Sequence, residues 1–192
     1  MTKYLALIKQ RTEESIAVKR ALLETQTETI ANVGRALVEA LRNGKTLYLF
    51  GNGGSAGDAQ HLAAELVGRF TKERRALPAV ALTTNTSALT ALGNDYEYAI
   101  VFARQLEAFG KPGDIAIGIS TSGNSPNVVK ALETAKTLGM VTVGLTGEGG
   151  GKTQAAADHC ICVPSRDTAR IQESHIMIGH ILCEIIECEL FG

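Results

Sequence analysis

TLYLFGNGGS, residues 46–55, is the stretch of sequence that decides the fold. Thr46 to Phe50 is a short apolar run, and Gly51 to Ser55 is rich in glycine, which is typical of a turn. The residues from Ser55 to Phe70 read as a helix. A strand, a glycine loop and a helix in this order begin a strand–helix–strand unit, so the stretch predicts an α/β fold.

The same unit recurs downstream. Four more strand-like runs lie at Ala79–Leu82, Asp114–Ile119, Val141–Leu145 and Cys160–Val163. A polar or glycine-rich turn comes directly after each of the first three, helices are predicted from about Ser87 and up to Leu138, and a long helix is predicted over Arg170–Leu190. Strands that alternate with helices predict a three-layer αβα sandwich on a mostly parallel five-stranded sheet.

Residues 1–43 precede the first strand and contain a single glycine, Gly34, and no proline. Apolar residues recur there at helical spacing, for example at Ile30, Val33, Leu37 and Leu41. We therefore expect two amphipathic helices before the main sheet. Because 192 residues can bury one substantial core but are few for two, residues 1–192 read as a single domain.

The charge balance excludes several classes of protein. Lys and Arg total 19 against 20 for Asp and Glu, a formal net charge of -1, so no cationic excess is available for nucleic acid. No run of apolar residues is long enough to span a membrane, and the first ten residues lack the pattern of a secretory signal. We expect a cytoplasmic protein that binds neither nucleic acid nor membranes.

The four cysteines all lie in the last quarter of the sequence, at Cys160, Cys162, Cys183 and Cys188. Two of them form a C-x-C on an apolar, strand-like segment. We expect reduced core thiols rather than disulfides or a metal cluster.

Two loops at the ends of predicted strands suit a phosphate group. Gly51–Ser55 and Ser120–Ser125 both lie at carboxyl ends, where open parallel sheets bind ligands. The second loop supplies hydroxyls from Ser120, Thr121, Ser122 and Ser125, and the helix after it presents its positive end. A single loop of this kind is more often a turn with a helix cap, but two at successive strands favour one site for a phosphomonoester. Neither G-x-G-x-x-G nor a P-loop motif is present, so no nucleotide cofactor is expected.

His61 and Glu65 are four residues apart on the helix that follows the first glycine loop. This spacing places them on one face, where both can reach one atom or one substrate. On spacing alone, a surface ion pair explains the two residues as well as a functional site does.

The last predicted helix carries polar residues among apolar ones, at Gln172, Glu173, His175 and His180. Taken alone, His180 reads more readily as a core histidine with a satisfied hydrogen bond. Gln172 and His180 are about 12 Å apart along an ideal helix and roughly 80° apart around it. If both bind one metal ion, we expect either a distorted helix or a site shared between subunits.

These loops and helix residues together resemble the sugar isomerase (SIS) superfamily, and most closely the phosphoheptose isomerase family. The matching segments are GNGGS at 51–55, Asp58-Ala59-x-His61, Glu65-Leu66-x-Gly68-Arg69, Gly93-Asn94-Asp95, GISTSGNS at 118–125, Leu145-Thr146-Gly147 and Arg170-Ile171-Gln172-Glu173-x-His175. The resemblance spans nearly the whole chain. Its isomerase-specific part is Glu65 with His61, Gln172 and His180, since a related replication-initiator-associating protein lacks equivalents of Glu65 and His180.

The resemblance implies an activity and a set of residues. The activity is the interconversion of sedoheptulose 7-phosphate and D-glycero-D-manno-heptose 7-phosphate through an enediolate, with Glu65 and His180 as the catalytic acid–base pair. One zinc ion per subunit is implied, with the ligands His61, Glu65, Gln172 and His180. The implied substrate-binding residues are Asn52, Gly53, Gly54, Ser55, Glu65, Asn94, Asp95, Ser120, Thr121, Ser122, Ser125 and Gln172. The family pattern also implies a homotetramer with active sites at subunit interfaces, in which the leading helices pack.

Three other interpretations remain open. The chain resembles isomerases of other sugar phosphates, such as pentose 5-phosphates, in its shared loops. A non-catalytic SIS protein that senses a phosphosugar or bridges partners would carry the same loops, although the retained Glu65 and His180 argue against it. The third is a structural α/β domain with ordinary turns, which the paired hydroxyl and glycine loops disfavour.

Overall fold

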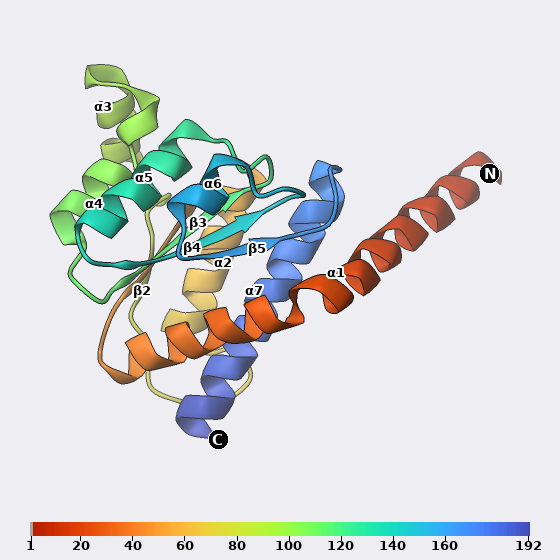
Figure 1. Ribbon diagram of the computed structural model, residues 1–192, viewed down its shortest axis with the longest axis horizontal. Coiled ribbons are helices and arrows are strands. Elements are labelled where there is room, and N and C mark those ends of the chain that lie inside the picture. Colours follow the sequence, from red (N-terminus) through yellow and green to blue (C-terminus); the bar gives the residue numbers. More distant parts are fainter. Residues whose placement is uncertain (1) are drawn as a thin grey trace.

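The computed structural model describes residues 2–192, and a five-stranded sheet forms its centre (Figure 1). The strands are β1 (Leu47–Gly51), β2 (Ala79–Ala81), β3 (Ile115–Ser120), β4 (Val141–Thr146) and β5 (His159–Cys162). They lie in the order β2-β1-β3-β4-β5, and every neighbouring pair is parallel. The predicted five-stranded α/β sheet is confirmed.

Helices cover both faces of the sheet, as the three-layer prediction requires (Figure 1). Helices α1 (Thr2–Arg42), α2 (Gly54–Val67) and α7 (Thr168–Phe191) pack on one face, and α4 (Ala103–Phe109), α5 (Pro126–Thr137) and α6 (Gly151–Ala156) on the other. Successive side chains of a strand point to opposite faces. In β1, Leu47 and Leu49 therefore join the first core, whereas Tyr48 and Phe50 join the second.

The N-terminal segment is one helix, so the prediction of two helices was wrong. Gly34, the only glycine in α1, lies inside the helix and is buried against α7. A Cβ atom at this position would lie 3.1 Å from the Ile185 side chain. Gly34 thus allows two helices to approach closely and does not break the first one.

Helix α3 (Thr86–Asp95) and the short 3-10 helix Tyr98–Ile100 lie at the edge of the domain. Neither contributes a buried residue, and α3 projects away from the sheet in Figure 1. The sequence reasoning placed α2 and α7 within a few residues of their observed bounds but missed α4 and α6.

The four cysteines are free. Cys183 is buried as expected, Cys160 and Cys162 are half-buried, and Cys188 is exposed, so the core assignment was wrong for Cys188. Cys160 and Cys162 share a hydrogen bond, which lowers the pKa of the Cys162 thiol and, together with burial, raises the pKa of the Cys160 thiol. Among residues 2–192, no helix has the length and apolar composition that crossing a membrane requires.

Candidate active site

The two phosphate-type loops meet at the point where the strand order of the sheet reverses. Strand β1 continues to β2 on one side, whereas β3 lies on its other side and leads on to β4 and β5. The Gly51–Ser55 loop follows β1 and the Ser120–Ser125 loop follows β3. Open α/β sheets bind their ligands in the crevice at this switch point, beyond the carboxyl ends of the strands.

The first loop is fixed in place by an amide pair. The Asn52 side chain donates to Asn127 Oδ1 at 2.9 Å, and the Asn127 side chain donates back to Asn52 Oδ1 at 2.8 Å. Gly53 has a φ of 56°, a conformation that favours glycine, and it directly precedes α2. Because Asn127 belongs to the first turn of α5, this pair couples the glycine loop to the helix that follows the serine loop.

The serine loop presents a cluster of hydroxyl groups at the start of α5. Ser120 Oγ lies 2.9 Å from Ser125 Oγ and 3.4 Å from Ser122 Oγ. Ser125 is the N-cap of α5, yet its side chain bonds no backbone N–H of that helix. Hydroxyl groups beside a helix N-terminus offer an anion several hydrogen bonds and the positive end of the helix dipole.

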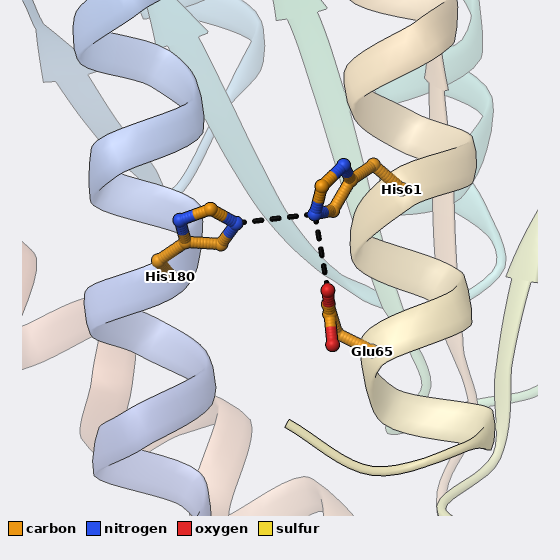
Figure 2. Close-up of side chains that lie close together, drawn as sticks. All are labelled: His61, Glu65 and His180. Carbon is orange, nitrogen blue, oxygen red and sulfur yellow. Dashed lines mark hydrogen bonds and ion pairs between the residues drawn. The ribbon is translucent and has the colours of Figure 1, made fainter. Parts of the chain in front are cut away.

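A second cluster lies between α2 and α7 and consists of His61, Glu65 and His180 (Figure 2). His61 Nε2 is 3.0 Å from Glu65 Oε1 and 3.1 Å from His180 Nε2. The Phe70 ring stacks on the His180 imidazole, with 5.4 Å between ring centroids. His61 and Glu65 therefore form a cluster with His180 and are not an isolated pair on α2.

The donor set of this cluster fits a zinc ion. One ligand atom from each of the three residues lies within 4.8 Å of the others. Two imidazoles and one carboxylate are a common ligand set of catalytic zinc, which leaves a position open for water or substrate.

Gln172 lies on α7, the helix that also carries His180, but more than two turns before it. Its amide packs on the first turn of α2, where Nε2 would lie 2.5 Å from a Cβ atom at Gly54. Helix α7 is continuous from Thr168 to Phe191, so Gln172 and His180 stay about 12 Å apart along it. Helix α7 has no break between Gln172 and His180, so of the two expectations for joint ligation, a broken helix is not observed.

Asn94 and Asp95 lie at the end of α3, and both are exposed. Their side chains hydrogen-bond to each other at 2.9 Å, so neither is held by the two loops. Tyr98 follows them, and its hydroxyl donates to Asn52 Oδ1 at 3.4 Å. This contact places the segment after α3 beside the first loop.

Two titratable groups near the site, the buried His175 and the half-buried Asp58, have shifted pKa values. His175 is 1% exposed, and its Nε2 lies 3.0 Å from the carbonyl oxygen of Thr146, at the end of β4. Desolvation by burial lowers the pKa of His175 to about 4, so its imidazole is neutral at pH 7. Asp58 lies one turn before His61, and burial raises its pKa although His61 opposes this. Glu173, also noted in the sequence, accepts a hydrogen bond from Ser15 in α1.

A buried ion pair fixes the segment after α2 onto α7. Arg74 Nε lies 3.0 Å from Glu187 Oε1, and both side chains are 1% exposed. Glu187 also accepts hydrogen bonds from the backbone N–H groups of residues 70–72. Arg74 donates to carbonyl oxygens at the end of α2, including that of Glu65 at 2.7 Å. The pair thus joins the end of the helix that carries Glu65 to the helix that carries His180.

Asn127, Phe70 and the ion pair were not predicted from the sequence. Arg74 and Glu187 are 113 residues apart, and no local pattern links them. Asn127 stands two residues after the serine loop, which was the only signal that could have indicated it.

Comparison with known proteins identifies the family of the chain. Residues 12–147 match the SIS domain family. The phosphoheptose isomerase of Roseiflexus sp. (strain RS-1) is 57% identical over 179 residues, which cover 93% of this chain and 91% of that protein. The phosphoheptose isomerase of Aquifex aeolicus is 55% identical, with 94% of each chain covered. The solved structure of the phosphoheptose isomerase of Neisseria gonorrhoeae superposes with a TM-score of 0.92 at 42% identity, covering 96% of this chain and 99% of that one. The chain belongs to the SIS domain family and, within it, to the phosphoheptose isomerases.

Proposed function

We propose that this protein is an aldose–ketose isomerase that interconverts sedoheptulose 7-phosphate and D-glycero-D-manno-heptose 7-phosphate. The observation that carries the proposal is the contact of Glu65 and His180 with one imidazole, that of His61, in a chain 57% identical to a phosphoheptose isomerase. His61 lies seven residues after Gly54, about 10 Å along α2 from the glycine loop. An extended seven-carbon sugar can therefore have its phosphate at the loops and its reacting carbons near His61, whose Nε2 lies 3.0 Å from Glu65 Oε1.

The reaction moves one proton between C1 and C2 and another between the two oxygens. Glu65 removes the carbon-bound proton, and His180 transfers the proton between the oxygens, which gives an enediolate intermediate. The two groups come from different helices, α2 and α7, so they can act on different atoms of one substrate. When bound by His61, Glu65 and His180, zinc would supply polarisation of the carbonyl or order these side chains.

The substrate-binding part of the proposal follows the two loops. The hydroxyls of Ser120, Thr121, Ser122 and Ser125 bind the phosphate, and their clustering beside the start of α5 supports this role. The sugar contacts the remaining proposed residues, Asn52, Gly53, Gly54, Ser55, Glu65, Asn94, Asp95 and Gln172. Free thiols at all four cysteines are consistent with the cytoplasmic location that we also propose.

Product analysis tests the activity directly. NMR of a mixture with sedoheptulose 7-phosphate should show the aldose, and a panel of pentose and hexose ketose phosphates should react far more slowly. Glu65→Gln and His180→Gln should each reduce kcat at least a hundredfold, the range of general acid–base catalysis. The matched control is Glu184→Gln, an exposed carboxylate on α7 that should retain full turnover. Near-normal turnover of Glu65→Gln or His180→Gln would remove the role given to that residue, and binding without any turnover in the wild type would favour a sugar-phosphate sensor.

We also propose a homotetramer with the active sites at its interfaces. Near its N-terminus, α1 exposes Tyr4, Leu5, Leu7 and Ile8, each at least 47%. An apolar groove between α1 and α7 adds to this surface. Burial of both against other subunits would remove apolar area from water, which drives association. Light scattering should give a tetramer for the wild type and smaller species for Leu5→Glu; a wild-type monomer with full activity would refute the proposal.

For Gln172, we propose that it is a ligand of a zinc site shared between two subunits of this tetramer. The continuous helix α7 keeps Gln172 away from His180 of the same chain, so in this proposal Gln172 meets the cluster of a neighbouring subunit. Elemental analysis should find one zinc per subunit, less in His61→Ala and less in Gln172→Ala. Unchanged zinc content and turnover in Gln172→Ala would exclude Gln172 as a ligand.

A further inference from the structure

Cys160 and Cys162 form a pair of thiols outside the active site. They alternate with Ile161 on β5, so both point to one face of the sheet while Ile161 is fully buried in the core on the other. Their Sγ atoms are 3.7 Å apart. Strand β5 is an edge strand, and both thiols are only half-buried, so reagents can reach them.

Strand β4 shapes the space around the two sulfurs. Thr146 lies opposite Cys162, and its hydroxyl is 3.4 Å from Cys162 Sγ and 3.7 Å from Cys160 Sγ. Gly144 lies opposite Cys160, and a Cβ atom there would approach Cys160 Sγ to 3.1 Å. The absence of a side chain at Gly144 leaves room for the first thiol, and Thr146 adds a polar group within reach of both.

The spacing disfavours a disulfide between the two thiols. Bonded sulfurs are about 2.05 Å apart, so at 3.7 Å the two sulfurs are not bonded, and the backbone spacing decides whether they can be. Residues two apart in a strand have Cα atoms about 6.6 Å apart, close to the upper limit at which a disulfide closes.

The same spacing suits one atom that bonds both sulfurs. With a bond of about 2.3 Å, the length found in zinc–thiolate sites, sulfurs 3.7 Å apart give an S–atom–S angle of about 107°. Linear coordination would need sulfurs about 4.6 Å apart at this bond length. Thiolates select soft ions over hard ones.

We propose that Cys160 and Cys162 form a two-sulfur site for a soft, thiophilic centre of pyramidal or tetrahedral geometry, such as trivalent arsenic. With an organic arsenous oxide, both S–H bonds and the arsenic–oxygen bond break and two As–S bonds form. The two protons leave with the oxygen as water, so the step requires neither an oxidant nor a reductant. The His61, Glu65 and His180 cluster offers no sulfur and does not compete for this probe.

Intact-protein mass spectrometry with one equivalent of phenylarsine oxide tests the site. The wild type should take up one phenylarsenic group with the loss of two protons, and an excess of a small 1,2-dithiol should remove it. Cys160→Ser and Cys162→Ser, which keep the side-chain size, should each lose the adduct at least tenfold. Cys188→Ser, which removes the exposed thiol of α7, should keep it; circular dichroism checks that all variants are folded.

Any one of these results would overturn the proposal: no adduct in the folded wild type, an adduct retained by Cys160→Ser or Cys162→Ser, or an adduct lost in Cys188→Ser. A Cys160–Cys162 disulfide that forms in air and blocks the arsenical would also overturn it, because it would show that the sulfurs close on each other.

Discussion

Replacement of Glu187 by glutamine should strongly destabilise the protein. The change leaves the guanidinium of Arg74 1% exposed without its counter-ion, and removal of one partner of a buried pair costs about 3–5 kcal/mol. For a chain of this length, each kcal/mol lowers Tm by about 2–4 °C, so we expect a decrease of about 6–20 °C. Thermal unfolding followed by circular dichroism at pH 7 measures it, with Glu184→Gln as the control. A Tm within about 2 °C of the wild type, the smallest shift expected per kcal/mol, would refute the reasoning.

A second variant separates the buried charge from the other contacts of Glu187. In Arg74→Met/Glu187→Gln the charge is gone, and the glutamine oxygen can still accept the N–H groups of residues 70–72. The double variant should therefore be more stable than Glu187→Gln alone. Equal or lower stability would mean that the contacts of the guanidinium with α2 matter more than the unpaired charge.

The pH dependence gives an independent test of the Glu187 carboxylate. Desolvation by burial raises the pKa of Glu187, but the hydrogen bonds from Thr71, Phe70 and Lys72 prevail and lower it to about 2. The unfolded chain then binds the proton first, so the stabilisation is complete above pH 4.5 and is lost as the pH falls from about 4.5 to 2. The stability difference between wild type and Glu187→Gln should shrink over this range; a constant difference would contradict the assignment.

Three further predictions concern the site and its support. Ser120→Ala removes the hydroxyl that joins Ser125 and should raise KM about tenfold with little change in kcat, measured by steady-state kinetics; an unchanged KM would place the phosphate elsewhere. Asn127→Ala breaks both hydrogen bonds to Asn52 and should raise KM with a loss of about 1–3 kcal/mol in unfolding free energy, whereas equal binding and stability would show that the glycine loop needs no such support. His175→Phe leaves the carbonyl of Thr146 without its donor and should lower the free energy of urea unfolding by about 1–3 kcal/mol; a large loss of kcat with normal stability would instead give His175 a catalytic role.

Sequence patterns located the sheet well because its strands carry short-range signals. Apolar runs such as Leu47–Phe50 end at glycine or hydroxyl-rich turns, and each predicted strand bound was within one residue of the observed one. The N-terminal helix was divided in error, because apolar residues at helical spacing indicate a helix but do not show whether it is continuous; Gly34 lies inside it and allows close packing against Ile185. Helix α6 was not predicted because it has only six residues and begins in a run of glycines.

In the candidate site, too, local features could be predicted from the sequence and contacts between distant residues could not. The spacing of His61 and Glu65 placed them on one face of α2, but the arrival of His180 from α7 depends on how two helices pack, which no local pattern records. The Arg74–Glu187 ion pair could not be predicted from the sequence at all. The two residues look like ordinary charged residues there, and they come into contact and become buried only in the folded chain.

Because the start of α1 is exposed, the rate of amide hydrogen exchange in this segment reports whether another surface is docked on it. Residues 2–13 are all exposed, whereas buried side chains begin at Leu22. Helical stretches shorter than about 12–15 residues are marginal in water without packing, so in a subunit with nothing docked on this end the amide protons of residues 2–10 should exchange with solvent far faster than those beyond Leu22. Any surface that docks on this end will slow their exchange, and the amides that are slowed will map its footprint residue by residue.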